Sequence, residues 1–162
     1  MRRAGFTLLE LLVVIAIIGL LSTFAVVSLN SGRAKARDAR RASDIRQIMT
    51  ALEFYFDDVG EYPETIATRI ILIGSSAADV LCYDQGDSIP TIGFYSSEAP
   101  CEIVYMAEVP TDPQNSSPYR YTYLNNTGAT DSYTITFELE NPNTAWGADT
   151  DCQASPGIVV CD

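Results

Sequence analysis

The stretch GFTLLELLVVIAIIGLLSTFAVVSL, residues 5–29, decides the fold of this 162-residue chain. The run of about 24 residues from Phe6 onward would form a helix of about 36 Å, longer than the roughly 30 Å of a bilayer core. Glu10 is the one charged residue in this segment. A carboxylate there costs roughly 2.5 to 3.5 kcal/mol on insertion scales, so we interpret Glu10 as functional and expect a partner for it. The nearest candidate is the amine that a cut after Gly5 would create.

The formal charge of -11 is distributed unevenly along the chain. Residues 31–50 carry six basic and two acidic side chains, whereas residues 51–162 carry two basic and eighteen acidic ones. Affinity for nucleic acid is built from lysine and arginine contacts to phosphate, so the acidic head argues against a nucleic-acid partner. The chain has no histidine and no Gly-x-Ser-x-Gly or glycine-rich phosphate motif. We therefore expect no enzyme activity and no cofactor.

Four cysteines follow the apolar segment, at Cys82, Cys101, Cys152 and Cys161. No two of them form a Cys-x-x-Cys pair, so we do not expect them to hold a metal. An even count in a head outside the cytoplasm indicates two disulfides, although four cysteines allow three connectivities. We favour the local pairs, Cys82 with Cys101 and Cys152 with Cys161. Four reduced, partly buried thiols are the alternative.

Other polar motifs in the head have structural interpretations. Asp149 and Asp151 are the candidates for calcium ligands, but a full site needs six to eight oxygens and few are visible. We therefore expect no bound metal. The Asn-x-Ser/Thr patterns that begin at Asn115 and Asn125 are interpreted as exposed loops.

A second helical segment follows the apolar one. Over residues 42–56 apolar side chains recur at spacings of three and four, which predicts an amphipathic helix with one buried stripe. Gly60 suits a left-handed cap and Pro63 cannot continue a helix, so the helix should end near residue 59. Residues 30–32 (Asn-Ser-Gly) are a soft point between the two segments. The charged and amide residues assigned to the other faces are Arg40, Arg41, Asp44, Arg46, Gln47 and Glu53.

Short β-prone runs follow the second helix. Residues 119–124 and 133–139 alternate with period two and are joined by a polar linker, which predicts an antiparallel hairpin. We expect a third strand near residues 103–107, whereas residues 70–73 fit either a strand or a short helix. The tyrosines of the first run are interpreted as sheet packing and not as a ligand-stacking surface. The pattern predicts an α+β fold, in which a long N-terminal helix packs on a small antiparallel β-sheet head.

Residues 5–19 strongly resemble the processing and assembly segment of type IV prepilins, which is shared with the pseudopilins of type II secretion. The similarity continues through residues 44–45, 51–55 and 60–63 and reappears at residues 109–113 and 119–121, where it is closest to G-type pseudopilins and major pilins. The resemblance implies a type IV pilin-like fold in four parts. These parts are a basic leader 1–5, a transmembrane or filament-core helix 6–29, an amphipathic helix 30–60 and an extracytoplasmic β head 61–162 with disulfide-closed loops.

The resemblance also implies roles for three residues at the N-terminus. A prepilin peptidase would cut between Gly5 and Phe6, and Phe6 would become the N-methylated first residue. Glu10 would then pair with the Phe6 amine of a neighbouring subunit, which neutralises two costly charges and fixes the axial register. An ion pair within one chain is the alternative.

By this resemblance the chain is a structural subunit of a type IV pilus or a related filament. It would first reside in the bacterial inner membrane as a single-pass precursor surrounded by lipid. An inner-membrane assembly platform with ATPase machinery would then polymerise it into a helical homo-oligomer, an extracellular pilus, with minor pilins as further partners. A subunit of a periplasmic type II secretion pseudopilus is the first alternative, and a membrane-anchored extracellular binding domain is the second. Cys152 and Cys161, which would close the region where a G-type pseudopilin has a calcium loop, favour a pilin.

Overall fold

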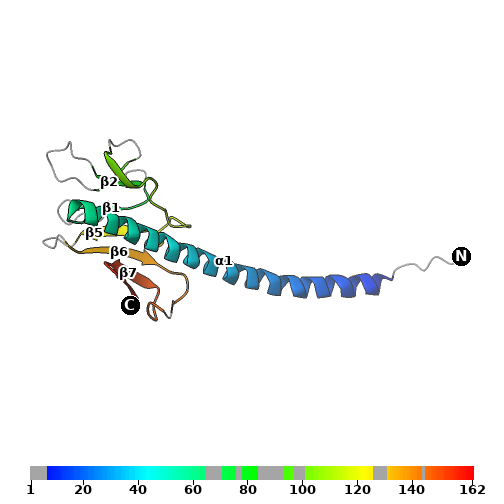
Figure 1. The fold of residues 1–162 in the computed structure, drawn as a ribbon. Helices are drawn as coiled ribbons and strands as arrows, with labels where there is room; N and C mark the ends of the chain where they lie inside the picture. Colours follow the sequence, from blue (N-terminus) through cyan, green and yellow to red (C-terminus); the bar gives the residue numbers. More distant parts are fainter. Residues whose placement is uncertain are drawn as a thin grey trace. The chain divides into compact units, whose positions relative to one another are not determined.

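The computed structural model describes residues 7–64, 71–75, 78–83, 93–96, 101–125, 131–143 and 145–162. The chain divides into two units, Met1–Ala36 and Arg37–Asp162. Helix α1, Leu8–Val59, supplies residues to both units (Figure 1). The helix continues through residues 30–32, so the predicted soft point is helical in this structure.

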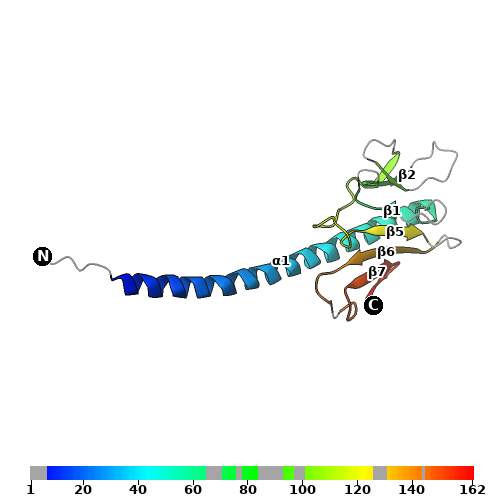
Figure 2. The same cartoon turned by 180° about the vertical axis from the view of Figure 1, so that it is seen from behind.

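The second unit contains two antiparallel sheets after the helix (Figures 1 and 2). The larger sheet has the strand order β1-β5-β6-β7-β8 and the smaller one the order β3-β2-β4. The strands are β1 (Ile71–Leu72), β2 (Val80–Tyr83), β3 (Phe94–Tyr95), β4 (Ile103–Met106), β5 (Thr122–Asn125), β6 (Tyr133–Glu138), β7 (Asp151–Ser155) and β8 (Ile158–Cys161). The α+β architecture predicted from the sequence is confirmed.

The predicted hairpin is the β5–β6 pair, with Tyr123 opposite Ile135. The strand expected near residues 103–107 is β4, which pairs with β2 in the smaller sheet. Of the ambiguous residues 70–73, Ile71 and Leu72 form β1.

The second helical segment ends where the sequence predicts. α1 stops at Val59, and Gly60 follows with a φ of +87°. Its N–H donates to the Phe56 carbonyl oxygen at 2.8 Å, which satisfies one of the carbonyls that a helix end leaves without a partner. A residue with a Cβ is strained at such a φ, so glycine is the suitable terminator here.

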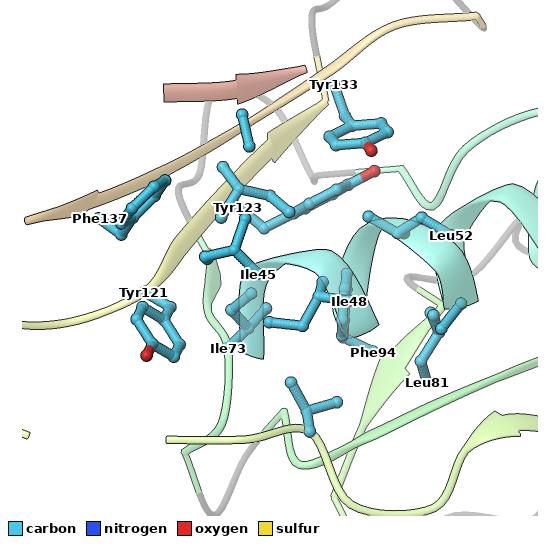
Figure 3. Close-up of a cluster of buried hydrophobic side chains, with 14 of the residues drawn as sticks. Ile45, Ile48, Leu52, Ile73, Leu81, Phe94, Tyr121, Tyr123, Tyr133 and Phe137 are labelled. Carbon is cyan, nitrogen blue, oxygen red and sulfur yellow. The ribbon is translucent and has the colours of Figure 1, made fainter. Parts of the chain in front are cut away.

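The core packs the buried stripe of α1 against side chains from both sheets (Figure 3). Ile45, Ile48 and Leu52 are fully buried on the helix, and Tyr121 and Tyr123 are buried on the sheet side. Each buried aliphatic side chain contributes about 1.5 to 3 kcal/mol relative to an exposed one. The predictions of an apolar stripe and of tyrosine packing are therefore confirmed.

Two polar positions on the helix were wrongly assigned to exposed faces. Arg41 and Asp44 are buried in the second unit. Asp44 accepts a hydrogen bond from the Tyr121 hydroxyl at 3.1 Å. Arg41 is buried because carboxylates from distant parts of the chain surround it, as described below. The hydrogen-bond partners that the tertiary structure supplies offset the cost of burying these two polar side chains.

Asn125 was also wrongly interpreted as part of an exposed loop. It lies at the end of β5 and is only 7% exposed. Its Nδ2 donates to the carbonyl oxygens of Tyr62 at 3.1 Å and Pro63 at 3.2 Å. This amide is therefore engaged in holding the segment that follows α1, whereas Asn115 is exposed.

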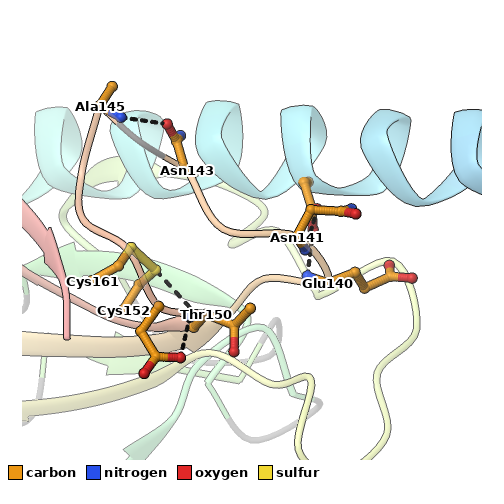
Figure 4. Close-up of a disulfide and its surroundings, with 9 residues drawn as sticks. Glu140, Asn141, Asn143, Ala145, Thr150, Cys152 and Cys161 are labelled. Atoms are coloured by element: carbon orange, nitrogen blue, oxygen red, sulfur yellow. Dashed lines mark hydrogen bonds between the residues drawn. A yellow bond between two sulfur atoms is a disulfide. The ribbon is translucent and has the colours of Figure 1, made fainter.

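Two disulfides close the second unit. They join Cys82 to Cys101 and Cys152 to Cys161, the two local pairings. Cys152 and Cys161 face each other across β7 and β8 (Figure 4). Beside this disulfide Gly147 approaches the backbone of Cys161 so closely that a Cβ would overlap its carbonyl oxygen.

Candidate functional site

The first unit presents an apolar helix surface to its surroundings. Every residue from Thr7 to Arg33 is exposed. The most apolar part of α1 has a mean hydropathy of 2.7, and none of it is buried. The helix is long and apolar enough to cross a membrane. A surface of this kind needs lipid or another apolar surface to cover it.

Glu10 lies at the N-terminus of this helix, in a reciprocal arrangement with Thr7. The Thr7 N–H and hydroxyl both donate to Glu10 Oε2, at 2.8 and 2.9 Å. In return the Glu10 N–H donates to Thr7 Oγ1 at 3.2 Å. This is a capping box, with Thr7 as the N-cap and Glu10 as the third helical residue.

The capping box gives Glu10 a local role that the sequence prediction did not consider. A carboxylate in the first turn interacts favourably with the positive end of the helix dipole and satisfies a backbone donor there. The Thr-x-x-Glu spacing before an apolar run was the available signal. The predicted cleavage and methylation site, Gly5 and Phe6, lies outside the described residues, as does the rest of the leader.

A second polar site, which sequence reasoning missed, lies in the second unit. We call it the ion-pair cluster; it consists of Arg37, Asp38, Arg41, Asp112 and Glu140. The Arg41 guanidinium donates to Asp112 Oδ2 at 2.6 Å and Oδ1 at 3.1 Å, to Asp38 Oδ1 at 2.8 Å and to Glu140 Oε1 at 2.9 Å. Arg37 donates to both oxygens of Glu140, at 2.6 and 2.5 Å. Such forked contacts to carboxylates are among the strongest hydrogen bonds that side chains make.

Electrostatics in the ion-pair cluster follow from this geometry. Burial lowers the pKa of Arg41, but its hydrogen bonds to three carboxylates raise the pKa overall. The hydrogen bond from Arg37 lowers the pKa of Glu140 to about 2, with further lowering from Arg41. Arg37, Arg41 and Glu140 are therefore charged near neutral pH.

The ion-pair cluster joins three segments of the second unit. Two arginines and Asp38 come from α1, Asp112 from the stretch after β4, and Glu140 from the stretch after β6. Asp38 also accepts from the backbone N–H groups of Glu140 at 2.9 Å and Asn141 at 3.0 Å. Removing one partner of such a buried group is costly, so the cluster fixes where these segments lie on the helix.

The calcium candidates lie near one another on the larger sheet. Asp151 begins β7 opposite Glu138 of β6, and Asp149 precedes it. Among the described residues no group of three or more His, Cys, Asp or Glu side chains is arranged to hold a metal ion. Calcium binding at Asp149 and Asp151 therefore has no support from this geometry.

This chain is similar to known proteins over its N-terminal segment and, in one case, over most of its length. Residues 1–26 match the model of the prokaryotic N-terminal methylation motif. The type II secretion system core protein G of Aeromonas hydrophila is 42% identical over 64 residues, 40% of this chain and 45% of the relative. The core protein G of Vibrio cholerae is 26% identical over 149 residues, 91% of this chain and 90% of the relative.

A pilin also appears among the relatives. The type IV major pilin protein PilA of Myxococcus xanthus is 30% identical over 63 residues, 39% of this chain and 29% of the pilin. The chain spans less than half the length of several of the curated relatives that it matches, including the Aeromonas protein. No solved structure matches the chain.

The fold and the N-terminal site define a class of α+β proteins in which an apolar N-terminal helix carries a methylation motif. The matches to the methylation motif, to core protein G and to PilA support the type IV prepilin and pseudopilin family as the one that this chain resembles.

Proposed function

We propose that the chain is a structural subunit of a type IV pilus or a related filament. It is made as a prepilin, cut after Gly5 by a prepilin peptidase, held in the inner membrane and polymerised through its N-terminal helix. The observation that carries the proposal is the fully exposed apolar helix, capped by Thr7 and Glu10, within the matched methylation motif.

The exposed helix surface suits two environments in turn. Before assembly lipid tails cover the apolar side chains, and afterwards the helices of neighbouring subunits replace the lipid. Contacts between different surfaces of identical subunits do not close on themselves and therefore generate fibres. Assembly machinery in the inner membrane supplies the work of extraction.

Glu10 connects processing with assembly in this proposal. In the structure its carboxylate accepts two hydrogen bonds from Thr7. The cut after Gly5 creates a cationic amine at Phe6, and the Phe6 amine of a neighbouring subunit then pairs with Glu10. An ion pair between subunits removes two unpaired charges from the filament core and sets the axial register.

A subunit of a type II secretion pseudopilus is the second candidate. Its support is the V. cholerae core protein G, which matches 91% of this chain. Imaging separates the two candidates, because a pilus extends as long fibres outside the cell and a pseudopilus stays in the periplasm. Deletion of this protein should remove long surface fibres in the first case. In the second it should block protein secretion without changing the cell surface.

The Glu10→Ala variant tests the proposed subunit contact. We expect it to insert in the membrane and be processed, but to be absent from filaments sheared from the cells. Glu64→Ala, which changes an exposed carboxylate of the second unit, is the matched control and should assemble normally. Normal incorporation of Glu10→Ala would contradict the register argument.

The Gly5→Val variant tests the processing site. A bulky side chain before the cut should block the peptidase, so the uncut precursor should accumulate. Mass spectrometry of the N-terminus measures this directly. Undiminished cleavage, or a mature chain that begins at a residue other than Phe6, would show that the site is wrongly assigned.

A further inference from the structure

One large apolar side chain of α1 lies outside the core of the second unit. The buried stripe of the helix packs against the sheets through Ile45, Ile48 and Leu52. Phe54 is instead 62% exposed, more than any other large apolar side chain that the structure describes in this unit. A single exposed apolar residue is common on protein surfaces, so its neighbours decide whether it marks an interface.

The neighbours of Phe54 on the helix surface are carboxylates. Asp57 and Asp58 follow it by three and four residues, which places them beside it on α1. Both are exposed, and neither forms an ion pair with any residue that the structure describes, although Asp58 accepts from the Tyr105 hydroxyl at 3.0 Å. We call Phe54, Asp57 and Asp58 the acidic patch. A fitting partner offers an apolar side chain next to a cation.

The first unit carries that combination. Leu29 is 55% exposed, and Arg33 follows it by four residues on the same side of the helix. Arg33 is exposed and forms no ion pair within the described ranges of the chain. We call Leu29 and Arg33 the neck patch.

The other exposed cations of α1 lack one or both of these properties. Arg40 lies 3.8 Å from the Asp44 carboxylate, and the Arg46 guanidinium lies over the Trp146 ring at 5.7 Å from its centre. An alanine precedes each of these arginines by four residues, and a serine precedes Lys35 at the same spacing. The neck patch is therefore the better match for an apolar side chain flanked by carboxylates.

We propose that the acidic patch of one copy packs against the neck patch of a neighbouring copy. Copies in a filament point the same way, and the apolar and charged members of each patch are separated by the same four residues. Both pairs therefore form at one register, in which residue 29 faces residue 54 and residue 33 faces residue 58. Asp57 adds a second carboxylate beside Arg33.

This inference rests on the proposed function, since the filament is what brings two copies together. A filament cored by N-terminal helices turns the uncovered face of α1 toward its neighbours, because the sheets pack on the other face. The contact joins two different surfaces, so it propagates along a fibre and does not close a dimer.

Photo-cross-linking from position 54 tests the register directly. Phe54→p-benzoylphenylalanine keeps an aromatic ring there, so the variant should still assemble. Sheared filaments are irradiated and denatured, and the covalent dimer is digested and analysed by mass spectrometry. We expect the link to lead to residues 26–33. Ile103→p-benzoylphenylalanine, at another exposed apolar position of the head, is the control and should give no dimer linked to that segment.

Side-chain truncation supplies a second readout. Phe54→Ala should reduce filament yield by at least about tenfold, the effect of removing an aromatic anchor from an interface. Ile103→Ala is the matched control and should leave the yield within about twofold, as expected for a surface substitution away from a contact. Trp146 fluorescence reports whether each variant retains its folded head.

Charge exchange tests the polar half of the contact. Arg33→Glu should reduce filament yield, whereas Lys35→Glu, the same change of charge on another side of the helix, should reduce it less. Adding Asp57→Lys with Asp58→Lys to Arg33→Glu should restore most of the yield. Cell fractions show whether each variant is inserted in the membrane and processed.

A control with the same net charge tests position. Glu102→Lys with Glu108→Lys, at two exposed head positions, should not rescue Arg33→Glu. Equal rescue would overturn the proposed contact, as would an unchanged yield from Phe54→Ala or a dimer linked outside residues 26–33. Filaments in which position 54 links only to lipid would also overturn it. Failure of the wild-type chain to form any filament would instead refute the proposed function, and this contact with it.

Discussion

Replacing Arg41 by methionine tests the ion-pair cluster most directly. Arg41 is fully buried, and three carboxylates lie 2.6 to 2.9 Å from its guanidinium. Methionine keeps an apolar stem but removes the charge, so the fully buried Asp112 side chain loses its cation. An uncompensated buried charge costs about 3 to 5 kcal/mol. We expect a loss of folding free energy near the upper end of that range.

The Asp112→Asn variant removes the other member of the Arg41–Asp112 ion pair and should lose less folding free energy than Arg41→Met. Arg41 retains two carboxylates in this variant. The asparagine oxygen can still accept from the backbone N–H groups of Gln114 and Asn115, which donate to Asp112 Oδ1 at 2.7 and 3.3 Å in the structure. We therefore expect a loss of folding free energy of about 2 kcal/mol, the contribution of charge-assisted hydrogen bonds. The structure predicts this asymmetry because the cluster holds three acids and two bases.

Urea unfolding of the full chain in detergent measures both losses. Trp146 is the one tryptophan and packs edge-on against Phe137 with ring centroids 6.0 Å apart, so its fluorescence reports on the second unit. Arg120→Met, at an exposed position, is the control and should change stability by no more than about 0.5 kcal/mol. The reasoning is refuted if Arg41→Met costs less than about 1 kcal/mol, or less than Asp112→Asn.

Three further predictions concern the same unit. Replacing both Cys152 and Cys161 by serine opens a loop with a sequence separation of 9 and should cost about 2.5 kcal/mol in urea unfolding, whereas no loss would show that the closed loop adds no stability. Gly147→Ala should lower the melting temperature, because its Cβ would overlap the Cys161 carbonyl oxygen; an unchanged melting temperature would contradict this close approach. Since the folded state lowers the pKa of Glu140 to about 2, its stabilisation is present above about pH 4.5 and is lost as pH falls toward 2. Glu140→Gln should therefore flatten acid unfolding in that window, and an unchanged acid profile would refute its role there.

Periodicity was enough to predict the elements that local sequence determines. The apolar stripe of α1, its end before Gly60 and the β5–β6 hairpin all follow from spacing and from residues with restricted backbone conformations. Thr7 and Glu10 were within reach of the same reasoning, since the capping-box spacing is local. The cost of a carboxylate in a membrane favours a distant partner for Glu10, whereas its hydrogen bonds at the helix end are local.

The ion-pair cluster could not be predicted in this way. Arg41 meets Asp112 and Glu140 across sequence separations of 71 and 99, and no local pattern encodes such pairing. A charge on a helix is exposed by default, so the assignment of Arg41 to a solvent face followed from its residue type alone. Two strands of the smaller sheet were missed for a different reason, because β2 and β3 have 4 and 2 residues and too few positions to show alternation.

Substitutions at Glu10 and substitutions in the ion-pair cluster should therefore have separable effects on this protein. In the second unit buried ion pairs and disulfides hold the segments in place, so changes there act through folding. In the first unit the described side chains are mostly exposed and apolar, and Glu10 contacts only its own helix start. A change at Glu10 should then abolish assembly while leaving Trp146 fluorescence and urea unfolding unaltered. A change at Arg41 should reduce assembly only in proportion to the fraction of unfolded head. If Glu10→Ala also destabilised the second unit, the two roles would not be separable, and the loss of filaments could no longer be attributed to a contact between subunits.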